Sequence, residues 1–181
     1  LSNVARRLVA EGWVREGTPV VSGPGKPRTP LQLDPAARCA VGIHLDPAVE
    51  TVVVVDLLGH VVAQTERTPR PDATRDQIVA DLVGTVESLL VEGGRSRASV
   101  LGIGVAAPGP LDAEAGILFE PPLLPPIWHD LALGPLLHEA TGLPTTVEKD
   151  VVAAMVGELW RDAAQELQDS IFVYYGAGVG V

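Results

Sequence analysis

Cysteine is almost absent from this sequence, because Cys39 is the only one among 181 residues. A single cysteine excludes an internal disulfide and a zinc site built from several cysteines, and such usage is typical of a reducing cytosol. The sequence also lacks an uncharged apolar run of about 18 residues and opens without a secretory leader. We therefore expect a cytoplasmic protein with no membrane partner.

Positive charge is scarce over most of the chain. With 13 Lys and Arg against 23 Asp and Glu, the formal net charge is −10. The charge is unevenly distributed, because residues 1–33, the head, carry +3 and residues 34–181, the body, carry −13. A small basic head on an acidic body favours nucleic acid as partner of the head and small molecules or proteins as partners of the body.

The head has the pattern of the last part of a winged helix. Apolar residues recur at spacings of three and four from Leu1, which predicts a helix ending at Gly12. A short strand follows, then a loop rich in glycine and proline at residues 16–30, and then a second strand. The order helix, strand, long loop, strand is that of a recognition helix and its wing.

The body predicts an α/β lobe. Three strand-like runs form an antiparallel meander: residues 39–45, 51–56 and 60–65. A helix with a capping box at Thr74 follows, and it buries a stripe of four apolar residues: Ile78, Leu82, Val86 and Leu89. An apolar strand at 100–106, typical of a sheet covered on both faces, precedes a hairpin through Gly116. Two further helices, one ending at Gly142 and one beginning at Asp150, flank a short strand.

Both ends of the chain look cut. Leu1 rather than Met stands first, already inside a helical pattern, and residues 172–181 run from a strand into a glycine-rich turn. A βα unit ordinarily continues from such a turn. We interpret the sequence as a fragment of a longer protein.

The predicted helix of the head has a polar, basic face. The candidate DNA contacts are four residues of this face and two cations of the loop after it: Ser2, Asn3, Arg6, Arg7, Lys26 and Arg28. Such a helix can meet base edges and phosphates in a major groove, and a proline-stiffened basic loop can enter a minor groove. The alternative for the helix is a solvated polar face.

Segments along the whole chain resemble the ROK family, named for repressors, open reading frames and kinases. Residues 2–14 resemble the recognition helix and first wing strand of its transcriptional regulators, and Gly-Lys-Pro-Arg at 25–28 resembles their Gly-Arg-Pro wing tip. Three further segments are similar to the family's sugar domain: Gly-Ile-Gly-Val-Ala-Ala-Pro-Gly-Pro-Leu-Asp at 102–112, Trp-His-Asp-Leu-Ala-Leu at 128–133 and Gly-Leu-Pro-Thr-Thr-Val-Glu-Lys-Asp at 142–150.

The resemblance implies an α/β fold, in which an actin-like, ribonuclease H-like ATPase lobe follows a partial winged helix-turn-helix. Residues 1–33 are then the C-terminal part of the DNA-binding domain, and residues 34–181 are the truncated N-terminal lobe of the sugar-sensing domain. The implied partners are a DNA operator, a sugar or sugar-derivative effector, and further copies of the chain in a dimer or tetramer. The family's zinc motif would lie beyond Val181, so we expect no cofactor within the chain.

The family contains both sugar kinases and regulators without catalysis. Its kinases have an Asp-x-Gly-Gly-Thr phosphate loop, whereas this chain has His44 at the Asp position and then Pro47, which lacks an amide hydrogen. Asp150 stands at the position of the kinase base, either as a vestigial catalytic residue or as an acid at a helix N-terminus. A second glycine cluster supplies candidate nucleotide-binding residues, with a plain turn as the alternative: Gly176, Gly178 and Gly180.

The ligand-binding residues that the resemblance implies are Gly109, Glu148, Lys149 and Asp150. Lys149 replaces the family's Asn, and a second Asn, of a Pro-Asn-Leu segment, is replaced near Leu123. A lysine removes an acceptor and adds a charge. We hypothesise that an anionic sugar, such as a sugar phosphate or acid, replaces a neutral hexose as the effector.

The remaining chemistry-bearing residues predict structural roles. His60, His129 and His138 have no metal-ligand spacing and suit the surface, and Cys39 suits the core of a strand. Trp128 packs either at the edge of the sugar cleft or in the core.

Two functions from different classes follow from these residues. The first is a sugar-responsive DNA-binding regulator, a repressor without catalysis, and the second is an ATP-dependent sugar kinase. The basic head and the loop at 44–48 favour the regulator. A third possibility is that the fragment does nothing alone.

Overall fold

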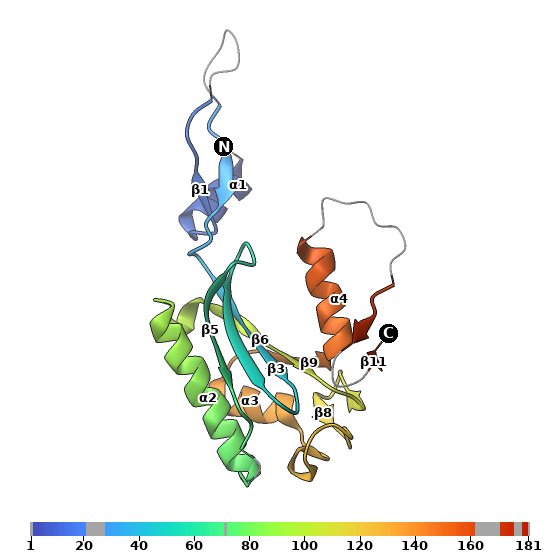
Figure 1. Ribbon diagram of the computed structural model, residues 1–181. Coiled ribbons are helices and arrows are strands. Elements are labelled where there is room, and N and C mark those ends of the chain that lie inside the picture. The colour runs from blue at the N-terminus through green and yellow to red at the C-terminus, as the bar shows by residue number, and fades with distance from the viewer. Residues whose placement is uncertain (1, 21–27, 71, 162–170, 176–178, 181) are drawn as a thin grey trace.

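A five-stranded mixed sheet is the centre of the body (Figure 1). The computed structural model describes residues 2–20, 28–70, 72–161, 171–175 and 179–180. The sheet has the order β5-β4-β3-β6-β9, and its strands are β3 (Cys39–Leu45), β4 (Glu50–Asp56), β5 (Val61–Arg67), β6 (Val100–Ala107) and β9 (Thr145–Lys149). The antiparallel pairing of β3, β4 and β5 confirms the predicted meander, whereas β6 lies parallel to both β3 and β9.

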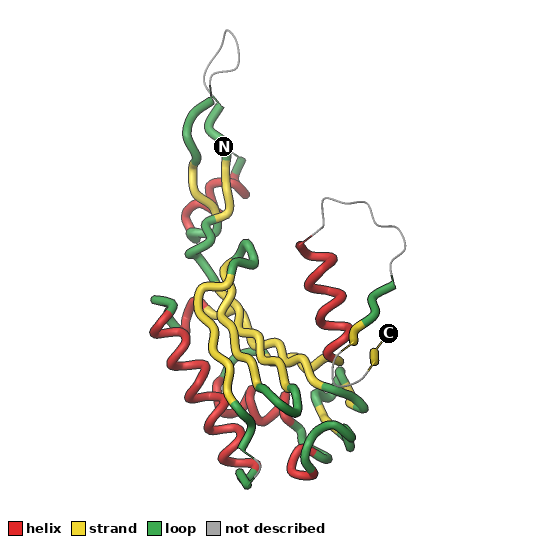
Figure 2. Tube along the Cα trace, viewed as in Figure 1, coloured by secondary structure: helices red, strands yellow, loops and turns green. Residues whose placement is uncertain are grey.

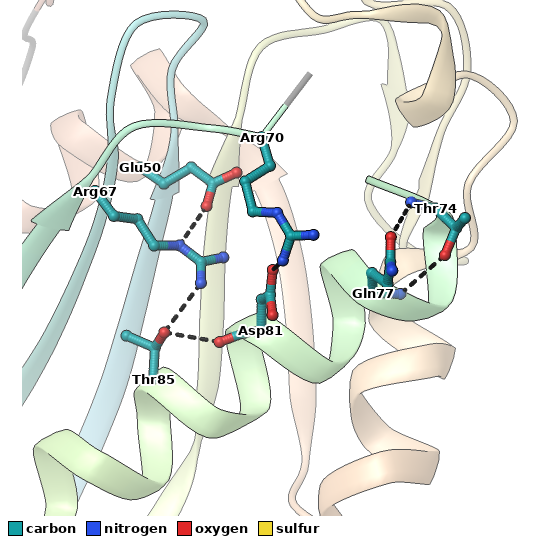
Figure 3. Close-up of polar contacts among 7 residues, drawn as sticks. All are labelled: Glu50, Arg67, Arg70, Thr74, Gln77, Asp81 and Thr85. Atoms are coloured by element: carbon teal, nitrogen blue, oxygen red, sulfur yellow. Dashed lines mark hydrogen bonds and ion pairs between the residues drawn. The ribbon is translucent and has the colours of Figure 1, made fainter. Parts of the chain in front are cut away.

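Two helices cover one face of this sheet. α2 (Arg75–Glu92) begins with the predicted capping box, in which Thr74 and Gln77 each accept a bond from the other's backbone amide (Figure 3). α3 (Leu133–Thr141) has Pro135 in its first turn and ends, as predicted, at Gly142 in the left-handed conformation. The predicted stripe of α2 is buried in a core whose largest fully buried members include Ile43, Leu45, Leu82, Leu90, Leu118, Leu131, Leu133 and Leu137. Burying each such side chain contributes roughly 1.5–3 kcal/mol relative to exposure.

The opposite face of the sheet carries α4 (Asp150–Arg161), as Figures 1 and 2 show. The sequence predicts this helix to about residue 167, and residues 162–170 lie outside the described part of the chain. Farther on, β10 (Tyr174–Tyr175) and β11 (Val179–Gly180) pair antiparallel. Among the described residues, no helix combines the length and apolar character that crossing a bilayer requires.

Short elements connect β6 to α3. The predicted hairpin through Gly116 is present as β7 (Leu111–Asp112) and β8 (Ile117–Leu118), and a single-turn helix, η2 (Pro126–Trp128), follows it; another single-turn helix, η1 (Arg97–Ser99), lies between α2 and β6. Gly116 has a φ of 67°, and a Cβ there would lie 3.1 Å from the Cα of Gly134. Both the left-handed backbone and the close approach to α3 therefore require glycine at this turn.

The head is a helix followed by a hairpin that extends away from the sheet (Figure 1). α1 (Asn3–Ala10) precedes β1 (Val14–Glu16) and β2 (Leu31–Leu33), which pair antiparallel, and an isolated bridge joins Val20 to Arg28. The predicted order of helix, strand, loop and strand is present. None of the residues of α1 is buried.

Candidate functional site

The carboxyl ends of three parallel strands meet at one edge of the sheet. β3, β6 and β9 run in the same direction, so the loop after β3, the turn after β6 and the start of α4 share this edge, which we call the carboxyl edge. Ligands of open α/β sheets bind at such edges. The predicted ligand residues Gly109, Glu148, Lys149 and Asp150 all lie here.

Gly109 and Lys149 are neighbours at the carboxyl edge. A methyl group on Gly109 would lie 3.9 Å from both Cδ and Cε of Lys149, so the lysine stem runs alongside the turn after β6. Gly109 stands between two prolines, which have no amide hydrogen. The two prolines therefore offer no backbone donor at this turn, and the cationic group beside it is the amine of Lys149.

Two carboxylates flank Lys149 in the sequence, and each bonds a backbone amide. Glu148 Oε1 accepts a hydrogen bond from the amide of Lys149 at 2.8 Å, and Asp150 Oδ1 accepts one from the amide of Val151 at 2.7 Å. Asp150 is the first residue of α4, where the helix dipole favours a negative charge. Its predicted role at a helix N-terminus is therefore present in the structure.

The loop after β3 offers few donors to a phosphate. His44 is the second-last residue of β3. In the loop that follows, Pro47 has no amide hydrogen, and the amide of Ala48 already donates to Asp46 Oδ1 at 2.9 Å. Phosphate loops bind through several free backbone amides that point to one place. This loop lacks that arrangement.

A groove that the sequence did not predict lies between the sheet and α4. Its volume is about 380 Å³, within the usual range for ligand pockets. Its floor is hollow because Gly42, Gly104 and Ala106 occupy neighbouring register positions on the face toward α4, and His44 and Glu148 flank Ala106. The sequence pattern that could have indicated this groove is the run of small residues at alternate positions of β6, on the face of the strand opposite its buried side chains.

Arg75 holds the segment that contains Trp128. Its guanidinium donates to the carbonyl of Ile127 at 3.2 Å, to that of Asp130 at 3.4 Å and also to that of His129. Trp128 is 3% exposed, so of its two predicted roles the structure shows the core role. Sequence reasoning gave Arg75 no role, because its partners are separated from it by more than 50 residues.

The Trp128 segment is linked to the carboxyl edge by backbone hydrogen bonds. The amide of Phe119 donates to the carbonyl of Pro110 at 3.1 Å, and the amide of Asp130 donates to the carbonyl of Phe119 at 2.6 Å. Leu123, near which the resemblance implies a replaced Asn, is exposed in the same connection. A chain of hydrogen bonds through Asp130 and Phe119 therefore connects Arg75 to Pro110, the residue after Gly109.

Five of the predicted DNA contacts, Ser2, Asn3, Arg6, Arg7 and Arg28, have described side chains and are exposed, but not all are free. Ser2 Oγ accepts a bond from the amide of Ala5 as the N-cap of α1, and Asn3 accepts one from Arg6. Arg7 Nε donates to Glu11 Oε1 at 2.6 Å, a bond that raises the pKa of Arg7 and lowers the pKa of Glu11.

The other predicted DNA and nucleotide residues lie in or beside segments that the structure omits. Arg28 lies on the hairpin, whereas Lys26, Gly176 and Gly178 lie outside the described residues, and Gly180 belongs to β11. No group of three potential metal ligands occurs within the described ranges. His60 and His138 are exposed as predicted, His129 is half-buried, and Cys39 is buried in β3 as predicted.

Comparison with known proteins identifies the family. The model of the ROK family matches residues 41–181. A transcriptional regulator of Mycobacterium bovis is 30% identical over 188 residues, a match covering 99% of this chain and 42% of that protein. The xylose repressor of Caldicellulosiruptor bescii is 23% identical over 180 residues, covering 99% of this chain and 45% of the repressor.

Among solved structures, a ROK family glucokinase from Streptomyces griseus in complex with glucose and AMPPNP aligns with a TM-score of 0.67 and 25% identity. The alignment covers 78% of this chain and 43% of the kinase. The chain thus spans less than half the length of the curated relatives it matches, and its α/β body has the actin-like ATPase fold. The sheet and helices match this structural relative, the family model covers residues 41–181, and the chain belongs to the ROK family.

Proposed function

We propose that this chain is part of a sugar-responsive, DNA-binding transcriptional regulator that acts as a repressor. The observation that carries the proposal is the basic head, a helix with an antiparallel hairpin and a net charge of +3 on a body of −13. The regulator relatives match 99% of the chain, head included, whereas the family model begins at residue 41 and the glucokinase structure covers 78%. A head of this charge suits phosphates.

In this proposal α1 and the hairpin contact the operator. Arg6, Arg28 and Lys26, which stands two positions before Arg28 in the sequence, supply phosphate contacts, and Asn3 and Arg7 lie on the same helix as Arg6, with Ser2 as its N-cap. Residues 1–33 then act as the C-terminal part of a winged helix, and residues 34–181 act as the first lobe of the sensor.

The body acts as a sensor rather than as an enzyme in this proposal. His44, Pro47 and the bonded amide of Ala48 leave the loop after β3 poorly suited to a nucleotide, and Asp150 bonds the first turn of α4. The alternative, an ATP-dependent sugar kinase, is favoured by Asp150 at the carboxyl edge and by the glucokinase relative.

The effector site of the proposal is the carboxyl edge, with Gly109, Glu148, Lys149 and Asp150 as its residues on this lobe. Effector binding favours one arrangement of body and head over another. In a homo-oligomer this changes the spacing of two heads and hence the match to two operator half-sites. The protein works in the cytoplasm, without a cofactor bound to this part of the chain.

The test is a gel-shift of the full-length protein against the DNA upstream of its own gene, with candidate sugars added. We expect a retarded band that a sugar derivative releases. Removing a phosphate contact by Arg28→Ala should flatten the slope of log affinity against log salt by about 0.9, whereas Arg7→Ala should change it less because Glu11 already neutralises Arg7.

A coupled assay for ADP release covers the alternative. Sugar-dependent turnover that Asp150→Asn abolishes would establish the kinase and refute the proposal. An absence of retarded DNA at low salt would refute it from the other side.

A further inference from the structure

Among the body's cations with described side chains, one has no hydrogen-bond or ion-pair partner: Lys149 at the carboxyl edge. Six arginines of the body have described side chains, and each donates to a carboxylate or carbonyl oxygen: Arg38, Arg67, Arg70, Arg75, Arg95 and Arg97. Among the described residues, the amine of Lys149 has no such acceptor and forms no ion pair, although its side chain is exposed. Three of these arginines pair with a carboxylate and three donate to carbonyl oxygens alone, so what sets Lys149 apart from them is that it has neither kind of acceptor.

The surroundings of Lys149 leave its amine accessible. The stem lies 3.9 Å from the position that a Cβ of Gly109 would take, so any side chain at residue 109 would stand in contact with the stem. The adjacent carboxylates of Glu148 and Asp150 each accept a backbone amide, from Lys149 and Val151 respectively. The edge therefore combines the free ammonium group of Lys149 with the carboxylate of Asp150, which can accept a further bond from a hydroxyl group, while Glu148 lies on the groove side of β9.

We propose that Lys149 makes the effector an anionic sugar derivative, one whose phosphate or carboxylate group binds the lysine while a hydroxyl donates to the adjacent Asp150. This inference rests on the proposed function, because it concerns the same effector site. A charged hydrogen bond is stronger than a neutral one, and the acidic body repels an anion that has no specific cation to meet it. Lys149 therefore determines specificity as well as affinity.

The experiment is calorimetric titration of the full-length protein with four probes: glucose, glucose 6-phosphate, gluconate and inorganic phosphate. At least one of the two sugar anions should bind about tenfold more tightly than glucose, the size expected of one charged hydrogen bond, and more tightly than inorganic phosphate. In Lys149→Asn the preference for the anion over glucose should fall to within about twofold. Lys149→Arg keeps the charge and should keep the preference.

A matched control removes a cation elsewhere. Arg15 is exposed on β1, so Arg15→Asn lowers the net charge by the same amount without touching the edge and should leave the preference unchanged. Thermal unfolding of each variant shows whether it is folded, and Lys149→Arg provides the comparison if Lys149→Asn unfolds. A loss of preference in Arg15→Asn as large as in Lys149→Asn would mean that overall charge, and not Lys149, is responsible.

The inference fails if glucose binds as tightly as both anions, if Lys149→Asn keeps the preference, if inorganic phosphate binds as tightly as the sugar phosphate, or if no probe binds. The gel-shift separates these failures from failure of the proposed function. If a neutral sugar releases the operator, the proposed regulator function holds and the inference of an anionic effector is wrong. Sugar-anion binding with no retarded DNA overturns the regulator alone.

Discussion

The guanidinium carbon of Arg38 lies 4.8 Å from the centre of the Trp13 ring. Trp13 connects α1 to β1 in the head, and Arg38 immediately precedes β3 of the body. The amide of Asp34 also donates to the carbonyl of Trp13 at 2.9 Å. Head and body are therefore joined by a stacked cation and a backbone hydrogen bond at one aromatic residue.

In the proposed regulator, this contact should carry part of the communication between effector and operator. Removing the stacked ring by Trp13→Leu should reduce the effector-dependent change in operator affinity about threefold, because an exposed cation–π contact contributes roughly 0.5–1 kcal/mol. Arg38→Met should have the same effect, and the double variant should add nothing further. Quantitative gel-shifts with and without effector measure the change, and strictly additive effects would show that the two residues act independently.

The three bonds from Arg75 should stabilise the body. Arg75→Ala should lower the free energy of unfolding by about 1–2 kcal/mol, since it leaves the carbonyls of Ile127, His129 and Asp130 without their charged donor. Urea denaturation measures the change. Arg70→Ala is the control, because the exposed pair of Arg70 with Asp81 contributes only about 0–1 kcal/mol. Equal losses in both variants would contradict a special role for Arg75.

The pair of Glu50 and Arg67 should behave as a buried ion pair. Glu50 is 4% exposed and its Oε2 accepts from Arg67 Nε at 2.6 Å, while Arg67 also donates to Thr85 (Figure 3). Glu50→Ala should cost about 3–5 kcal/mol of unfolding free energy, because it leaves a partly buried cation without its carboxylate. The double variant with Arg67→Met should recover part of this loss. A double variant no more stable than Glu50→Ala would refute the account.

Asp56 should make the free energy of unfolding depend on pH in the acidic range. Burial raises the pKa of Asp56, but hydrogen bonds from the amides of His60 and Leu58 outweigh burial, so the pKa lies below its usual value. A lowered folded-state pKa contributes stability above the unfolded value of about 3.9, and this contribution is lost as the pH falls through the folded value. Urea denaturation between about pH 6 and pH 3 should show a steeper loss for the native protein than for Asp56→Asn. Parallel curves would contradict this.

Local patterns were sufficient to predict most of the body. The meander, the capping box at Thr74 and the end of α3 at Gly142 each depend on residues within a few positions of one another. The resemblance to the ROK family supplied Gly109 and Lys149 as ligand residues, and the structure places both at the carboxyl ends of strands, while their role in binding stays a prediction.

Contacts between distant polar residues could not be predicted. Arg75 meets His129 across 54 residues and Arg67 meets Glu50 across 17, and no periodic pattern records such pairs. Trp128 was compatible with two environments until the packing of η2 placed it in the core. The pairing of Arg7 with Glu11 is a helical spacing of four that the sequence does show, and it weakens one of the predicted DNA contacts.

The loop after β3 also constrains how the protein could change by mutation. Pro47 has no amide hydrogen, and the amide of Ala48 is occupied by Asp46. Replacing Pro47 alone would leave the Ala48 amide bonded, and replacing Asp46 alone would leave the proline in place. Freeing both backbone amides thus requires at least two substitutions, so no single mutation gives this loop both donors.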